Sequence, residues 1–212
     1  MNREHGNPAE AVFFGQLISM EGPVMVNEAI RFAMEAHEGQ KRKGTTRPYI
    51  THPLEVATIV SYIRPDETLL TAALLHDTME DCGVTGEIIR ERFGMKVATL
   101  VAAETDDKSK PWHERKTIKL RELSRASEEV QIIALSDKLA NIREIWNDYY
   151  EIGDRLWSRF SAGNKDSIGW YYRGLRDALS DLSYLPQYQE FSILVSRLFD
   201  SRTAYASASA ES

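Results

Sequence analysis

The feature that most constrains this chain is an apolar stretch that ends in ionisable side chains. Residues 69–75 are apolar at six of seven positions, and His76 and Asp77 follow directly. Glu80 and Asp81 come one helical turn later, and residues four apart share a helix face. An imidazole and three carboxylates at the end of an apolar helix are costly to bury unless a cation neutralises them. The stretch therefore predicts a helix that presents ligands to a divalent metal.

Helical periodicity recurs along the rest of the chain, and no strand-like alternation stands out. Apolar residues between Val26 and His37 recur at steps of three and four. Gly94 is expected to stop one helix, and Pro186 is expected to separate the last two. The fold class is therefore predicted as all-α. The predicted helices span residues 26–37, 53–63, 66–79, 85–93, 97–103, 112–123, 127–150, 170–182 and 191–199.

The length of 212 residues suits one domain with a sizeable core. We expect it to comprise a flexible N-terminal arm (1–24), a core that carries the motifs (25–150), C-terminal helices that complete the same domain (151–203) and a disordered tail (204–212). The single cysteine, Cys82, excludes an intrachain disulfide and fits a reducing compartment, so a cytoplasmic location is expected.

The charge of the chain bears on its partners. The formal net charge is −6, whereas non-specific binding to nucleic acid or to an anionic membrane needs a basic surface. The longest apolar runs are also too short to cross a bilayer. We therefore expect neither nucleic acid nor a membrane as a partner. The sequence makes no prediction of the oligomeric state.

Two residues outside the opening motif support a metal site. Asp137 follows Val130 and Ile133 on one helical stripe, so its carboxylate is expected to face the core. A buried carboxylate needs compensation, which a salt bridge or a shared metal can supply. His52 precedes Pro53, which favours extended or turn backbone, so His52 is expected at a helix entrance.

In chain order, His52, the pair His76-Asp77 and Asp137 resemble the H…HD…D ligand pattern of the HD phosphohydrolase superfamily. The likeness covers about residues 26–146. Within it, residues 104–116 are similar to the small stand-alone alarmone hydrolases of the metazoan SpoT homologue type (Mesh1-like). The segments that resemble the hydrolase domain of the RelA/SpoT enzymes are residues 36–40, 48–53, 72–81, 93–94 and 137–141.

The resemblance implies an HD-domain helical bundle with a single metal site. Its ligands would be His52, His76, Asp77 and Asp137. A set of two imidazoles and two carboxylates favours Mn²⁺, Fe²⁺ or Zn²⁺ over Ca²⁺ and Mg²⁺. The usual ion of the family is Mn²⁺, which is therefore the expected cofactor.

The resemblance also implies roles around the metal. Glu80 and Asp81 would act on the attacking water and the leaving group; the alternative is a solvated helix end. Arg42 and Lys43 lie on a basic loop and would contact the nucleobase and phosphate; the alternative is a solvated turn. Asn141 matches a substrate-contacting Asn of the family. Weaker candidates for substrate contacts are Tyr49, Lys138 and Arg143.

The sequence thus predicts a metal-dependent phosphohydrolase with a nucleotide substrate. The expected reaction removes the 3′-pyrophosphate from guanosine 3′,5′-bispyrophosphate, (p)ppGpp, to give GDP or GTP and pyrophosphate. One alternative is the same chemistry on the 2′-phosphate of NADPH or on a nucleoside monophosphate. Another is a metal-stabilised, nucleotide-binding regulatory module, against which Glu80 and Asp81 argue. The aromatic group expected to form C-terminal core is Trp146, Trp157, Trp170, Tyr171 and Tyr172.

Overall fold

The computed structural model describes residues 24–200, which form helices and no strands, so the all-α prediction is confirmed. One isolated antiparallel bridge, between Lys41 and Pro48, closes the basic loop. The described residues divide into two compact units. The first unit comprises residues 24–41 and 47–105, and the second comprises residues 42–46 and 106–200.

Some predictions about chain organisation lie beyond this description. The expected arm, as far as residue 23, and the expected tail lie outside the described residues. The grouping of all helices into one domain stays a prediction. In the part of the chain that the structure describes, no helix has both the length and the hydropathy needed to cross a bilayer.

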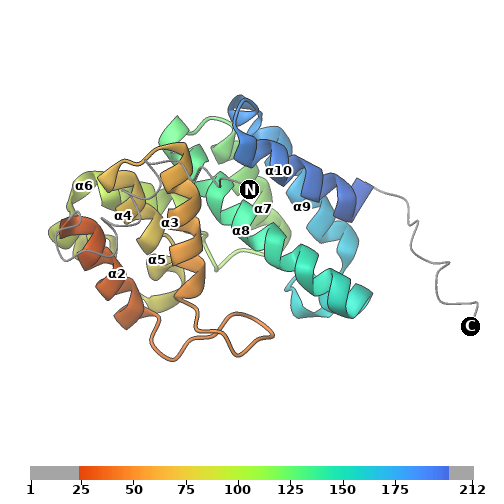
Figure 1. Cartoon of the computed structure of the whole chain (residues 1–212), viewed down its shortest axis with the longest axis horizontal. Helices are drawn as coiled ribbons and strands as arrows, with labels where there is room; N and C mark the ends of the chain where they lie inside the picture. Colours follow the sequence, from red (N-terminus) through yellow and green to blue (C-terminus); the bar gives the residue numbers. More distant parts are fainter. Residues whose placement is uncertain (1–23, 201–212) are drawn as a thin grey trace, which may run out of the picture. The chain divides into compact units, whose positions relative to one another are not determined.

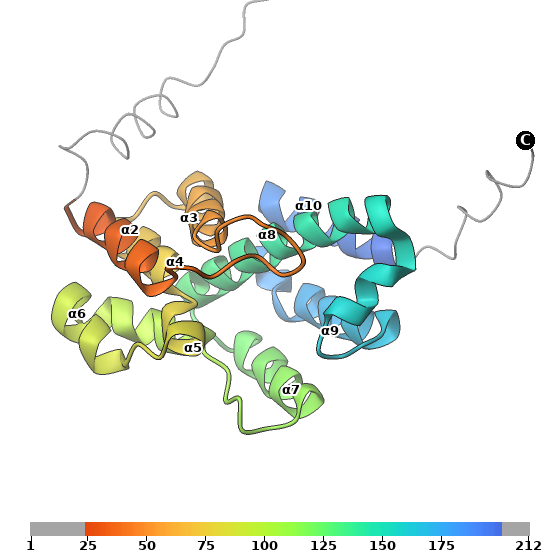
Figure 2. The same ribbon diagram turned by 90° about the horizontal axis from the view of Figure 1, so that it is seen from below.

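The first unit is built around helix α4, which is buried over most of its length. Its neighbours α2, α3 and α6 pack against it (Figures 1 and 2). All residues of α4 from Leu69 to Leu75 are buried, which explains why all of them except Thr71 are apolar. The side chain of Asp66 caps its start by accepting a hydrogen bond from the Leu69 amide at 2.9 Å. The helices of this unit are α2 (Val24–Ala36), α3 (Thr51–Ile63), α4 (Glu67–Leu75), α5 (Thr78–Cys82) and α6 (Gly86–Glu104).

The continuous helix predicted over residues 66–79 is wrong, because the chain breaks at His76 and Asp77. Helix α4 ends at Leu75 and α5 begins at Thr78. The Thr78 hydroxyl donates to the Leu75 carbonyl at 2.7 Å, and His76 Nδ1 lies 2.8 Å from the Ala73 carbonyl oxygen. Side chains thus satisfy carbonyls that a continuing helix would have used. The break places the His-Asp pair at the buried end of α4.

Two local predictions in the first unit concern Gly94 and His52. Gly94 adopts φ 88° and ψ 165° and kinks α6, so the predicted helix stop is confirmed at a backbone conformation that favours glycine. His52 is the second residue of α3, so its predicted place at a helix entrance is confirmed, whereas the predicted extended or turn backbone is wrong. Its amide donates to the Tyr49 carbonyl at 2.9 Å. Pro53 needs no hydrogen-bond donor in a first turn, so the helix can begin at Thr51.

The second unit is organised along the long helix α8. Helix α10 and the segment η1 pack against α8, while α9 packs against α7 and α10 (Figure 1). Ser127 caps the start of α8, since its hydroxyl accepts a hydrogen bond from the Val130 amide at 3.5 Å. The elements are α7 (Trp112–Leu123), α8 (Glu128–Ile152), η1 (Gly153–Arg159), α9 (Lys165–Ala178), η2 (Ser180–Leu182), α10 (Pro186–Val195) and η3 (Ser196–Asp200).

The helix boundaries of the second unit agree with the predicted bounds in α7 and differ from them in α9 and α10. Helix α7 has the predicted bounds. Helix α9 begins five residues early, because the Asn164 side chain caps it by accepting from the Ser167 amide at 2.8 Å. Pro186 occupies the first turn of α10 and so starts the helix that it was predicted only to precede. Of the aromatic group expected to be core, Trp157, Tyr171 and Tyr172 are buried, and Trp146 and Trp170 are half-buried.

Asp106 ties the start of the second unit to α7. Its carboxylate is 4% exposed and accepts a hydrogen bond from Lys116 Nζ at 2.6 Å, with Arg115 Nη1 at 3.4 Å. Burial alone raises the pKa of Asp106. The charge and hydrogen bond of Lys116, with the charge of Lys119, outweigh burial and leave this pKa below 3.8.

We expect Asp106→Asn to lower the free energy of unfolding by about 2 kcal/mol at neutral pH, because the surrounding cations lose their anion. The folded pKa lies below the unfolded value, so this stability is present above the unfolded pKa and is lost as pH falls through the folded pKa. Denaturant titrations at pH 7 and near pH 3 should show the difference shrinking in acid. The exposed neighbour gives the control Asp107→Asn, with a change below about 0.5 kcal/mol. Equal losses in both variants would contradict the role given to Asp106.

Candidate functional site

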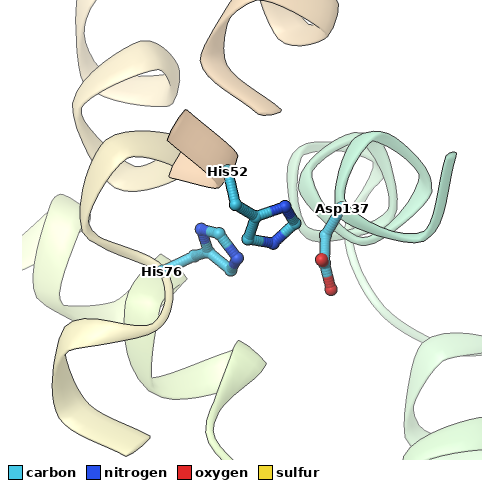
Figure 3. Close-up of side chains that lie close together, drawn as sticks. All are labelled: His52, His76 and Asp137. Carbon is cyan, nitrogen blue, oxygen red and sulfur yellow. The ribbon is translucent and has the colours of Figure 1, made fainter. Parts of the chain in front are cut away.

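Two imidazoles and one carboxylate of the first unit lie together. The rings of His52 and His76 have centroids 5.2 Å apart (Figure 3). Oδ2 of Asp77 lies 3.0 Å from Nε2 of His76 and 3.7 Å from Nε2 of His52. Both histidines are buried, and Asp77 is half-buried. The His-Asp pair and the separate histidine predicted from the sequence are thus neighbours within this unit.

The hydrogen bond made by Nδ1 of His76 determines whether Nε2 of the same ring carries a proton or a lone pair. Nδ1 lies 2.8 Å from the Ala73 carbonyl oxygen, which can only accept, so Nδ1 carries the proton. In the neutral ring, Nε2 then points a lone pair at the Asp77 carboxylate, which also has only lone pairs. Two acceptors 3.0 Å apart need a proton or a metal ion between them. Metal-binding histidines commonly donate their other N–H to a carbonyl, so this arrangement fits a divalent ion.

Tyr49 borders this group. Its hydroxyl donates to Oδ2 of Asp77 at 2.7 Å, and Oδ2 of Asp81 lies 3.4 Å from the same hydroxyl. The Tyr49 ring stacks on His37, with centroids 4.7 Å apart and an angle of 26°. His37 is 3% exposed, and its ring is hydrogen-bonded to the Gln40 side chain.

The predicted acid–base pair lies on the short helix α5. Glu80 is half-buried and Asp81 is exposed. The Asp81 amide donates to the Asp77 carbonyl at 2.9 Å, so these two residues keep the helical spacing although α4 is interrupted. The Asp81 carboxylate thus stands beside the residue that faces both imidazoles.

In the second unit, Asp137 projects from α8 and is 4% exposed, so the predicted inward orientation is confirmed (Figure 3). Lys138 Nζ contacts Oδ2 of Asp137, and Asn141 Nδ2 donates to Oδ1 at 2.5 Å. The ion pair that the sequence left open as an alternative is therefore present. It comes from the adjacent Lys138, which is itself a candidate for substrate contact.

The basic loop residue Arg42 belongs to the second unit and is held by α8. Its Nη2 donates to Oδ1 of Asn141 at 2.8 Å, and its Nε donates to Oε2 of Glu144 at 3.0 Å. Lys43 is exposed. Sequence reasoning missed Glu144, although it lies seven residues after Asp137 and three after Asn141. Extending the helical stripe by one more turn would have found it.

Arg159 likewise pairs with a carboxylate of α8, closer to the C-terminal end of that helix. Arg159 Nη1 pairs with Oδ2 of Asp148 at 2.9 Å, and the Arg159 guanidinium lies against Gly44 of the loop. The remaining weak candidate, Arg143, makes a bidentate ion pair with Glu190 of α10, with both N–O distances 2.7 Å. Asn141 and Arg42 are therefore linked to Asp137, whereas Arg143 is joined to α10.

Comparison with known proteins identifies relatives over most of this region. The HD domain family matches residues 29–163. Guanosine-3′,5′-bis(diphosphate) 3′-pyrophosphohydrolase MESH1 of Xenopus tropicalis is 42% identical over 124 residues, which are 57% of this chain and 69% of that protein. Human MESH1 is 41% identical over 123 residues, 56% of this chain and 68% of that protein. The 3′-pyrophosphohydrolase of Aquifex aeolicus is 41% identical over 57% of this chain, but over only 18% of its own length.

Solved structures give the same grouping. The structure of a metazoan ortholog of SpoT that hydrolyzes ppGpp matches with a TM-score of 0.68 at 27% identity, over 86% of this chain and 97% of that chain. Protein lmo0812 from Listeria monocytogenes matches with a TM-score of 0.66 at 31% identity, over 71% of this chain and 99% of that chain. With the family match covering more than half of its residues, this chain belongs to the HD-domain family and is a relative of the MESH1 proteins.

Proposed function

We propose that this chain is a metal-dependent phosphohydrolase that converts guanosine 3′,5′-bis(diphosphate) and water into GDP and pyrophosphate. The observation that carries the proposal is the pair of imidazole Nε2 atoms directed at one oxygen of Asp77. The MESH1 relatives, which are named for this reaction, support the choice of substrate. The activity would lower the level of an alarmone and so act in the stringent response, in the cytoplasmic setting expected from the single cysteine.

The proposed metal ligands are His52, His76 and Asp77 of the first unit and Asp137 of the second. Three of them, His52, His76 and Asp137, are buried, and a metal ion would offset the cost of burying them. Two nitrogen and two oxygen donors suit Mn²⁺, which we propose as the cofactor. When bound, such an ion lowers the pKa of a water molecule and neutralises charge on the phosphoryl oxygens.

The proton transfers fall to Glu80 and Asp81. Water attacks the phosphorus joined to the ribose O3′, the bond from that phosphorus to O3′ breaks, and pyrophosphate leaves. One proton must leave the attacking water, and O3′ must gain one. A carboxylate within hydrogen-bond reach can accept the first, and its protonated form or its neighbour can supply the second. The contact of Asp81 with the Tyr49 hydroxyl, beside Asp77, supports this assignment.

Arg42, Lys43 and Asn141 are the proposed substrate contacts. Glu144 balances the charge of Arg42, so the flat face of the guanidinium is the part suited to stacking on a base. Lys43 is exposed and offers its full charge to phosphate. Lys138 and Arg143 are proposed only as outer contacts, because each already pairs with a carboxylate.

Changing Arg42 and Lys43 together to Ala should raise KM for guanosine tetraphosphate by about 10-fold or more and change kcat much less. Contacts made equally in the ground and transition states act mainly on KM. Initial rates over a range of nucleotide concentrations measure both constants. The matched control, Arg90→Ala with Lys96→Ala on α6, removes the same net charge and should leave KM within about twofold. An unchanged KM in the Arg42–Lys43 variant would show that this loop is a solvated turn that does not contact the substrate.

A panel of nucleotides tests the proposed function. Mn²⁺-loaded protein should give its highest kcat/KM with guanosine tetraphosphate, compared with NADPH and nucleoside monophosphates. A preference for NADPH would keep the metal chemistry and change the substrate. Tight nucleotide binding without turnover by any of them would instead favour the regulatory module and contradict an enzymatic role.

A further inference from the structure

The hydroxyl of Tyr49 lies where it can set the orientation of a proposed metal ligand. It donates to Oδ2 of Asp77 at 2.7 Å. This is the same oxygen that lies 3.0 Å from Nε2 of His76 and 3.7 Å from Nε2 of His52. The terminal torsion of an aspartate side chain is broad and intrinsically weakly restrained. A hydrogen bond to one oxygen therefore determines which lone pairs of the carboxylate face the imidazoles.

The ring that carries this hydroxyl is itself held in place. Tyr49 stacks on His37, with centroids 4.7 Å apart. His37 Nδ1 lies 2.9 Å from Oε1 of Gln40 and 3.2 Å from Sγ of Cys82. The backbone carbonyl of Gln40 also accepts the Tyr49 amide at 2.9 Å. Gln40 thus fixes both the ring behind Tyr49 and the backbone of Tyr49, so the hydroxyl has little freedom to move.

Tyr49 and Gln40 also contact Asp81 of the proposed acid–base pair. Oδ2 of Asp81 is 3.4 Å from the Tyr49 hydroxyl, and Gln40 Nε2 donates to the Asp81 carbonyl at 3.3 Å. One tyrosine therefore stands between a proposed metal ligand and a proposed proton-transfer residue. A group in this place can hold the two carboxylates at a constant separation.

We propose that Tyr49 is a positioning residue for the metal centre: its hydroxyl orients the Asp77 carboxylate, and the stack on His37 orients the hydroxyl. The proposal rests on the assignment of Asp77 as a metal ligand in the proposed function. It differs from the substrate contact that family resemblance implied for Tyr49. Partners that orient metal ligands typically change metal affinity by about 10- to 100-fold when they are removed.

Calorimetric titration of metal-stripped protein with Mn²⁺, without any nucleotide, tests this role. Tyr49→Phe keeps the stacked ring and removes only the hydroxyl, so Kd for Mn²⁺ should rise about 10- to 100-fold. The control Tyr188→Phe removes another tyrosine hydroxyl bond, to the Arg176 carbonyl at 2.8 Å in the second unit, and should bind Mn²⁺ as wild type does. His37→Ala keeps the hydroxyl and removes its support, so it should show a smaller loss. The double variant should bind no more weakly than Tyr49→Phe, since both changes act through one hydroxyl.

Steady-state rates separate positioning from substrate contact. At saturating Mn²⁺, Tyr49→Phe should recover most of its kcat with KM for guanosine tetraphosphate near that of wild type. Unchanged Mn²⁺ affinity in Tyr49→Phe, or an equal loss in Tyr188→Phe, would overturn the proposal. If Tyr49→Phe does not fold, the His37→Ala titration takes its place: weaker Mn²⁺ binding supports the proposal, and unchanged binding overturns it. Because the titrations use no nucleotide, they stand even if the wild-type protein hydrolyses a different substrate.

Discussion

Asp137→Ala should abolish hydrolysis, with kcat/KM falling more than about 100-fold. Loss of partners that only orient ligands costs about 10- to 100-fold, so loss of a ligand should cost more. Asp137 is the one proposed ligand from the second unit, and it is buried. The bound Mn²⁺ per protein, measured by elemental analysis after desalting, should fall together with the activity.

The same helix offers a matched control for this variant. Asp148 lies eleven residues after Asp137 on the same stripe of α8 and pairs with Arg159. Asp148→Ala removes a carboxylate and an ion pair and should retain the metal and most of the activity. If Asp137→Ala keeps its metal and turns over normally, Asp137 serves only its ion pair with Lys138, and the proposed ligand set is wrong.

Glu80→Gln should lower kcat by about 100-fold or more while leaving the metal content and the fold intact. The amide is nearly the same size as the carboxylate but cannot accept a proton, and general acid–base groups typically contribute about 10²- to 10⁴-fold. Single-turnover rates with Mn²⁺-loaded protein measure the chemical step directly. Glu87→Gln, at an exposed position of α6, is the control and should keep the wild-type rate. Loss of metal in Glu80→Gln would instead make Glu80 a ligand.

The sequence was sufficient for the features that depend on local signals. The bounds of helix α7 and the start of helix α8 near Ser127 follow from local signals, and the kink at Gly94 follows from one residue type. The inward orientation of Asp137 follows from its spacing after Val130 and Ile133. Each of these depends on residues within about two helical turns, where periodicity is informative.

The features that sequence reasoning missed depend on distant or competing contacts. Arg42 and Glu144 are 102 positions apart, and no local pattern joins them. The break after Leu75 arises because the side chains of His76 and Thr78 compete for backbone carbonyls, which an apolar periodicity does not reveal. The bond from Tyr49 to Asp77 likewise joins residues 28 positions apart. Such contacts decide the chemistry of a site and need the folded structure.

Product analysis of guanosine tetraphosphate hydrolysis provides the most direct test of the proposed enzyme. Mn²⁺-loaded protein is incubated with the nucleotide, and ³¹P NMR follows every phosphorus atom. We expect GDP and pyrophosphate in equal amounts with no orthophosphate, loss of the reaction on adding a chelator, and its return with Mn²⁺. Release of orthophosphate, or an unchanged substrate with folded and metal-loaded protein, would contradict a 3′-pyrophosphohydrolase.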